Sequence, residues 1–246
     1  MVDIRRHHLP AVEAFDETAM ALFQQGWETY RKVVDHNYMF HREVCGLLRR
    51  ILEDEAAKPI RFLDIACGDA RATVGALQGL PVAHYYRIDL SRPALELARA
   101  AVGALGCPAT LHERDFVDAL ADWSEPVDVA WIGQSLHHLL APGKLALMRR
   151  IRDIVGERGL FLIWEPTLLD GEGQDGWVHR LDLSGRSAWT ALTPAEREAM
   201  LVHCRDADFA ETAAGWLALG RGAGFGEVQE LYAAPTGLAR VYRFRV

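Results

Sequence analysis

The first region of the chain has the spacing of apolar residues that is typical of helices. Through residues 11–57, apolar side chains recur three and four positions apart, and the pattern weakens near Gly26 and again near Asn37. Lys58 and Pro59 end the region. The pattern predicts an N-terminal helical segment, interrupted twice, that precedes any strand.

Short apolar runs then alternate with helical segments. IRFLDIA, AHYYRIDL, PATLHERDF, VDVAWIG and LFLIWEP predict five strands, at residues 60–66, 83–90, 108–116, 127–133 and 160–166. Helices are predicted for residues 69–80, 91–106 and 141–159, the second with Ser91 as N-cap and Pro93 in its first turn. Strands that alternate with helices indicate a doubly wound α/β fold with a parallel sheet.

The pattern changes after residue 166. Residues 167–191 are rich in Gly, Asp and Ser, and they predict a loop or short cap element. Helices are predicted for residues 192–204, with Thr193 as N-cap and Pro194 at the first position, and for 206–225, ending at Gly224. Residues 225–246 predict two antiparallel strands around an AAPTG turn. We therefore expect a helical lid over 1–57 and an α/β domain over 58–246, with a substrate-cap insertion at 167–210.

Composition and charge narrow the class of protein. Of the 246 residues, 50% are hydrophobic and 25% are charged, as in ordinary soluble globules, and no apolar stretch approaches the roughly 20 residues of a membrane span. The net charge of −7 disfavours a nucleic-acid partner and favours a small molecule. The four cysteines are widely spaced, without the pattern of a metal site. They indicate free thiols, no metal and a cytoplasmic location, and the N-terminus lacks the apolar core of a secretory signal.

The turn after the first strand carries the most specific signal. In FLDIACGDA, at residues 62–70, only Gly68 matches the glycine pattern G-x-G-x-x-G of dinucleotide sites, since Ala66 and Arg71 occupy the flanking glycine positions. The charge of Asp64, at the end of the strand, would oppose a diphosphate and attract an ammonium group. The turn therefore favours a cationic nucleoside without phosphate.

With this turn the chain resembles the class I S-adenosylmethionine (SAM)-dependent methyltransferases. FLDIACGDA is similar to the first motif of that family and departs from it at Ala66 and Ala70, where glycine is frequent. The resemblance covers residues 60–165 closely. It implies a seven-stranded sheet of order 3-2-1-4-5-7-6, with the last strand antiparallel and SAM as the cofactor.

The resemblance also implies which residues contact SAM. Asp89, at the end of the second strand and followed by Leu90, would accept the ribose hydroxyls, while Asp115 would contact the adenine amine and Phe116 the adenine ring. Gln134, after the fourth strand, would border the methionine part. In the lid, Tyr38 or Tyr30 would contact the sulfonium, unless these rings pack as core. The set assigned to the cofactor is Asp64, Ala66, Gly68, Asp89, Leu90, Asp115, Phe116, Gln134 and Tyr38.

Candidate catalytic residues follow the fourth and fifth strands. His137 and His138 could remove a proton from the acceptor, and Glu165 could orient the imidazole. The pattern resembles small-molecule and sugar O-methyltransferases, although each residue could equally hold the local backbone. Trp177 and Trp189 are consistent with either a flat apolar acceptor pocket or a small satellite core.

These features predict methyl transfer from SAM to a small-molecule acceptor, with a hydroxyl oxygen favoured as the acceptor atom. N- or C-methylation stays open, and so does a non-catalytic module that binds SAM or S-adenosylhomocysteine (SAH). We expect no membrane or nucleic-acid partner. The lid helices could pair with a second subunit, so a homodimer is left open.

Overall fold

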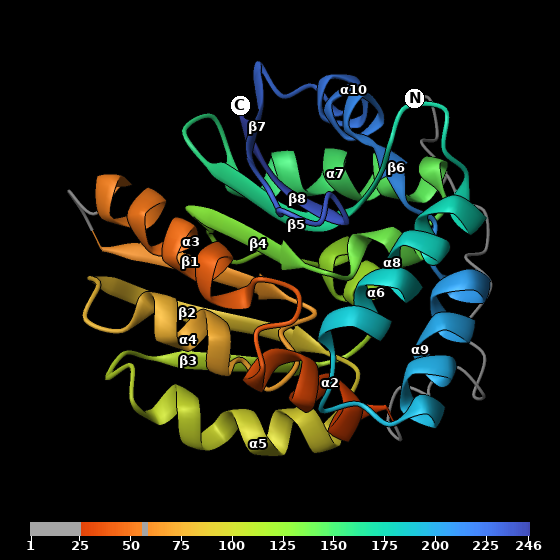
Figure 1. Cartoon of the computed structure of the whole chain (residues 1–246). Coiled ribbons are helices and arrows are strands. Elements are labelled where there is room, and N and C mark those ends of the chain that lie inside the picture. Colours follow the sequence, from red (N-terminus) through yellow and green to blue (C-terminus); the bar gives the residue numbers. More distant parts are fainter. Residues whose placement is uncertain (1–25, 56–58) are drawn as a thin grey trace.

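The computed structural model describes residues 26–55 and 59–246, and a single twisted sheet forms its centre (Figure 1). The strands lie in the order β3-β2-β1-β4-β5-β8-β7, and a two-residue strand, β6, pairs with β5 outside that path. The strands are β1 Ile60–Ile65, β2 Val82–Asp89, β3 Ala109–Glu113, β4 Val129–Gly133, β5 Leu160–Leu168, β6 Glu211–Thr212, β7 Glu227–Ala233 and β8 Ala239–Arg245.

The sheet confirms the expected topology. Strands β1 to β5 pair in parallel, and β8 runs antiparallel to both β5 and β7. The short β6 is additional, so the sixth and seventh strands of the expected order are β7 and β8. All residues of β5 except the last are buried, as is usual for a strand covered on both faces.

Helices cover both faces of the sheet. Helices α3, α4 and α5 pack on one face around Phe62 and Tyr85, whereas α6, α7 and α10 pack on the other around Leu63 and Ile65. The helices are α2 Trp27–Asp35, α3 His41–Glu55, α4 Arg71–Leu77, α5 Arg92–Gly103, α6 Phe116–Ala121, α7 Ala141–Val155, α8 Gln174–Ala188, α9 Pro194–Ala207 and α10 Ala213–Ala223, with a 3-10 helix η1 at Leu136–His138.

A separate small core joins α2 to α8 and α9. Val33 of α2 packs with Trp177 and Leu181 of α8 and with Leu201 of α9, beside the end of the sheet (Figure 1). Lys32 of α2 also contacts Glu196 of α9, with Nζ and Oε1 2.6 Å apart. The part of the predicted helical segment before residue 26 lies outside the described residues. No helix within 26–55 or 59–246 has the length and apolar composition needed to cross a bilayer.

Several element boundaries agree with the sequence. The interruption near Asn37 separates α2 from α3, and Asn37 has a φ of 57°. Ser91 caps α5 by accepting from the backbone N–H of Ala94. Thr193 begins α9 with a capping box, in which Thr193 and Glu196 each accept the other's backbone N–H.

One predicted element differs in type and two differ in their bounds. The third strand ends at Glu113 and not at residue 116, because Asp115 is the N-cap of the short helix α6, which was not predicted. Most of 167–191 is helix α8, whose Trp177, Leu181 and Gly185 are buried at helical spacing despite the Gly-rich composition. The predicted helix over 206–225 starts later, at Ala213. Thr212 is its N-cap, because the Thr212 side chain accepts from the backbone N–H of Gly215.

The close approach of α10 to the sheet can be tested by substitution at Gly220. A Cβ at this position would lie 2.3 Å from the Phe244 ring of β8 and 3.0 Å from Val228 of β7. Gly220→Ala should therefore lower the free energy of unfolding by about 1–3 kcal/mol. Gly75→Ala is the matched control, since nothing lies within 4 Å of its Cβ, and it should stabilise the protein by about 0.5–1 kcal/mol. Urea unfolding of both variants measures the difference, and equal effects would contradict the packing.

Candidate functional site

The turn between β1 and α4 is fastened to the end of β2. The backbone N–H of Gly68 donates to Asp89 Oδ2 at 2.7 Å, and the N–H of Cys67 donates to the carbonyl of Ile88 at 3.1 Å. The other Asp89 oxygen accepts from the N–H of Ser91 at 2.7 Å. Each carboxylate oxygen has a second lone pair, so Asp89 can still accept hydroxyls from a ligand at this edge.

The turn uses left-handed backbone at residues that are not glycine. Ala66 and Ala70 both have a φ of 55°, and Gly68 has a φ of 54°. The two alanines are the positions at which the sequence departs from the family motif. The departure therefore leaves the geometry of the turn in place and adds backbone strain, which for a non-glycine residue is about 1–2 kcal/mol.

Asp64 lies within β1, below the turn, with a side chain that is almost fully buried. Burial raises the pKa of Asp64 to about 7, although the Tyr85 hydroxyl, which donates to Oδ2 at 2.5 Å, opposes the rise. Its proton is therefore held only weakly at neutral pH. A cation bound above the turn would favour the ionised form.

Tyr30 of α2 extends over this acidic end of the sheet. Burial raises the pKa of its hydroxyl, and the nearby carboxylates of Asp69, Asp89 and Asp64 raise it further, although 39% of Tyr30 stays accessible. Sequence reasoning named Tyr30 only as an alternative to Tyr38. The assigned set also omitted Asp69, whose carboxylate accepts from the backbone and side chain of Arg71.

Tyr38 contacts the cap instead. Its ring stacks on Trp189 with centroids 5.5 Å apart, and its hydroxyl accepts from the backbone N–H of Ala191 at 2.8 Å. Tyr38 and Trp189 also line a hollow of about 240 Å³ between the α2–α3 turn and α8. These contacts are typical of packing between lid and cap.

The remaining residues assigned to the cofactor occupy the same edge of the sheet. Asp115 Oδ1 accepts from the backbone N–H groups of Val117 and Asp118, and Oδ2 accepts none from the described residues. Phe116 is buried in the core, and Leu90, after β2, is half-buried. Gln134 follows β4 with a φ of 59°, and its N–H donates to the carbonyl of Trp164 at 2.7 Å.

The structure brings the three candidate catalytic residues together. Glu165 of β5 is fully buried and accepts from the backbone N–H groups of Ser135, Leu136 and His137 at 3.1, 2.9 and 3.3 Å. Its Oε2 also lies 2.7 Å from His137 Nδ1. One carboxylate therefore fixes both the start of η1 and the ring of His137.

A fourth residue of this group, Asp208, was missed by sequence reasoning. Burial by itself would lower the pKa of His137, but the charges of Asp208 and Glu165 on either side raise it above its ordinary value. His137 therefore carries a proton when no other cation is present, and that state favours a positioning role over proton removal. Asp208 lies in a segment that the sequence assigned to a helix, so no pattern linked it to the histidines.

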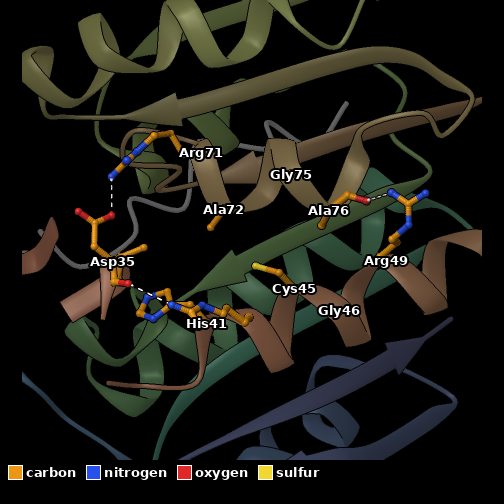
Figure 2. A pocket seen from close by; sticks show the side chains of 11 residues that line it. Asp35, His41, Cys45, Gly46, Arg49, Arg71, Ala72, Gly75 and Ala76 are labelled. Atoms are coloured by element: carbon orange, nitrogen blue, oxygen red, sulfur yellow. Dashed lines mark hydrogen bonds and ion pairs between the residues drawn. The ribbon is translucent and has the colours of Figure 1, made fainter. Parts of the chain in front are cut away.

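A hollow of about 350 Å³ lies elsewhere, along the groove between α3 and α4 (Figure 2). It is lined from α3 by His41 and Cys45 and from α4 by Ala72 and Gly75. At its end, Arg71 Nη2 lies 3.6 Å from Asp35 Oδ1 and links the lid to α4. None of the residues predicted for the site lines this hollow.

The backbone strain in the turn after β1 can be tested by substitution at Ala66. Ala66→Gly should raise the free energy of unfolding by about 0.5 kcal/mol or more, because relief of the left-handed strain exceeds the added flexibility of glycine. Ala72→Gly, within α4, should lower it by about 0.5–1 kcal/mol. Chemical denaturation monitored by circular dichroism compares the two. A loss of stability in Ala66→Gly as large as in Ala72→Gly would show that residue 66 has no such strain.

The sequence matches one protein family, described as a methyltransferase domain, over residues 62–159. The matched part runs from β1 to the end of the α7–β5 connection and so includes the turn, Asp89 and both histidines. No curated protein matches the sequence.

Solved structures share the fold at low sequence identity. An O-methyltransferase family protein from Burkholderia thailandensis has a TM-score of 0.58 and 18% identity, over 84% of this chain and 58% of that one. A magnesium protoporphyrin IX methyltransferase from Synechocystis PCC 6803, with bound SAH, has a TM-score of 0.58 and 14% identity, over 94% and 96%. An O-methyltransferase family 2 protein from Planctomyces limnophilus, in complex with apigenin, has a TM-score of 0.52 and 19% identity, over 76% and 49%.

The chain spans little more than half the length of the first of these similar structures. Fold, strand-end turn and family match agree. Residues 62–159 therefore match a methyltransferase domain, in a chain that has the fold of these solved structures.

Proposed function

We propose that the protein transfers a methyl group from SAM to a hydroxyl oxygen of a small molecule. The observation that carries the proposal is the arrangement of one edge of the sheet. The ends of β1 and β2 present the turn with Asp64 and Asp89, and the ends of β4 and β5 present His137, His138 and Glu165. Carboxylates that suit a cationic cofactor thus lie beside histidines that suit an acceptor hydroxyl, and a transfer between two substrates needs both at neighbouring strand ends.

The cofactor half suits the charges of SAM. Asp64 would interact with the ammonium group and Asp89 with the ribose hydroxyls, while Asp115 and Phe116 would contact adenine. Leu90 and Gln134 would border the cofactor from the ends of β2 and β4. Tyr30 is better placed than Tyr38 to cover the sulfonium, because the carboxylates around the turn influence its hydroxyl and Tyr38 stacks on the cap.

The acceptor half lies at the ends of β4 and β5. Methyl transfer to oxygen needs the acceptor to be aligned behind the methyl group and its proton to be removed. His137, His138 and Glu165, together with Asp208, are titratable side chains at this position. The O-methyltransferase family names of two similar structures, one of them in complex with apigenin, support oxygen in a small molecule as the acceptor atom.

The insertion at 167–210 would form one wall of the acceptor site. Trp177 and Trp189 are buried in the small core of the cap, so they shape that wall from behind rather than line it. The four cysteines are unpaired, as suits a reducing compartment, and we place the protein in the cytoplasm on that basis.

SAM affinity should depend on the protonation of Asp64. With a pKa of about 7 in the folded protein, Asp64 is mostly protonated at pH 6, so a cationic ligand must displace that proton. The dissociation constant for SAM should therefore fall by about eightfold between about pH 6 and pH 7.5. Isothermal titration calorimetry measures this change. Asp64→Asn should bind SAM with much less dependence on pH, and an unchanged dependence would contradict the role of Asp64.

A methyl-transfer assay tests the reaction itself. Incubation with methyl-labelled SAM and a panel of phenols, sugars, amines and acids should give an O-methylated product, identified by NMR. His138→Ala should lower kcat by about 100-fold with an unchanged dissociation constant for SAM, because the acceptor side loses a group and the cofactor side does not. His84→Gln is the control, since His84 lies near the start of β2, at the opposite edge of the sheet.

Each other outcome of the assay contradicts part of the proposal. A methyl group found on nitrogen or carbon would replace oxygen as the acceptor atom. SAM binding without product from any acceptor would indicate a binding module. Failure to bind either SAM or SAH would contradict the cofactor assignment as well.

A further inference from the structure

Three imidazoles converge on one carboxylate oxygen beside the end of β4. Asp208 Oδ1 lies 3.4 Å from His137 Nε2, 3.4 Å from His138 Nδ1 and 3.8 Å from His203 Nε2. Direct N–H···O hydrogen bonds have lengths of about 2.7–3.2 Å. This buried oxygen accordingly has no hydrogen-bond partner among the described residues. An unpartnered oxygen surrounded by nitrogens at such distances indicates that a ligand atom belongs between them.

The two distances from Asp208 Oδ1 to the rings of His137 and His138 match the edges of a metal coordination shell. Zinc–nitrogen bonds of about 2.0–2.1 Å and zinc–oxygen bonds of about 2.0–2.2 Å in a tetrahedron place neighbouring ligand atoms about 3.3–3.5 Å apart. One ligand atom each from His137, His138 and Asp208 lies within 4.8 Å of the others. Two imidazoles and one carboxylate form a donor set that zinc and ferrous iron both use in catalytic sites.

The charges at the cluster also favour a divalent cation. Glu165 and Asp208 flank His137 on opposite ring nitrogens, and both carboxylates are buried. One imidazolium neutralises only one of these two negative charges. A divalent ion held by neutral histidines neutralises both, and buried charge is costly unless it is compensated.

The residues around the cluster already hold it in place. Glu165 accepts from His137 Nδ1, which is the usual outer contact of a metal-binding histidine and leaves Nε2 free to face an ion. The backbone N–H of Phe209 donates to the carbonyl of His137 at 2.8 Å, so the segment that carries Asp208 is fastened to η1. The buried Lys144 of α7 donates to the carbonyl of Phe209, which fixes the same segment to α7.

We propose that His137, His138 and Asp208 bind a divalent transition-metal ion, with His203 at the mouth of the site. The His203 side chain is 27% exposed and gives the ion a route from solvent. Metal binding is independent of the methyl-transfer reaction. Only its chemical use rests on the proposed function: an ion at this strand end would bind the acceptor oxygen and lower the pKa of its hydroxyl.

Direct metal binding tests the proposal. The full chain, stripped with EDTA and dialysed against Zn²⁺, should retain one ion per chain by elemental analysis. Asp208→Asn and His138→Gln should each weaken the affinity at least tenfold, measured by competition with a chromophoric chelator. His84→Gln should bind as the unaltered protein does, because it removes an imidazole at the opposite edge of the sheet. Circular dichroism checks that the variants fold.

Substitution with Co²⁺ identifies the ligands. A site of nitrogen and oxygen donors should give visible d–d bands without a sulfur-to-cobalt charge-transfer band in the near ultraviolet. Such a charge-transfer band would place the ion at a cysteine and overturn the assignment, as would a metal content near zero or an unchanged affinity in the folded Asp208→Asn variant. Metal binding without methyl transfer would contradict the proposed function alone, and methyl transfer by a protein that binds no metal would contradict this inference alone.

Discussion

The geometry of the proposed acceptor side depends on the buried carboxylate of Glu165. It lies in the middle of the sheet's edge, on β5, and accepts the backbone N–H groups with which the chain leaves β4. Without it, those donors would be buried and unpaired, at a cost of about 1–3 kcal/mol each. The same carboxylate orients His137. Because one side chain sets both the backbone and the ring, η1 and its two histidines have little freedom to move independently.

Asp89 has the corresponding role on the proposed cofactor side. It joins the turn after β1 to the start of α5 through Gly68 and Ser91. Both carboxylates therefore fasten the loop that leaves a neighbouring strand, and both lie at the carboxyl edge of the sheet. The carboxyl ends of parallel strands all lie at that edge. The hydrogen bonds of these two carboxylates are therefore enough to fix both halves of the proposed two-substrate site.

The sequence predicted the sheet and the position of the turn after β1 well, because both depend on local patterns. Buried strands are continuous apolar runs, and the turn after β1 is contiguous in sequence. The cap was predicted less well. Gly171, Gly173 and Gly176 precede or enter α8 and concealed a helix whose buried side chains recur every four residues. The start of α10 depends on a single capping threonine, Thr212, which a search for helical periodicity passes over.

The cluster at the ends of β4 and β5 was predicted only in part, because its members are far apart in the sequence. His137 and His138 stand out as a pair, and Glu165 ends a predicted strand, but Asp208 has no distinctive neighbours in the sequence. Its position depends on non-local contacts that His137 makes with Asp208 and Phe209 and that Lys144 makes with Phe209, and these form only after the sheet and α7 are assembled. Cysteine and histidine spacing therefore gave no sign of a metal site. Ligands that come from the end of a strand and from a segment about 70 residues later have no characteristic spacing, so only the folded chain shows them together.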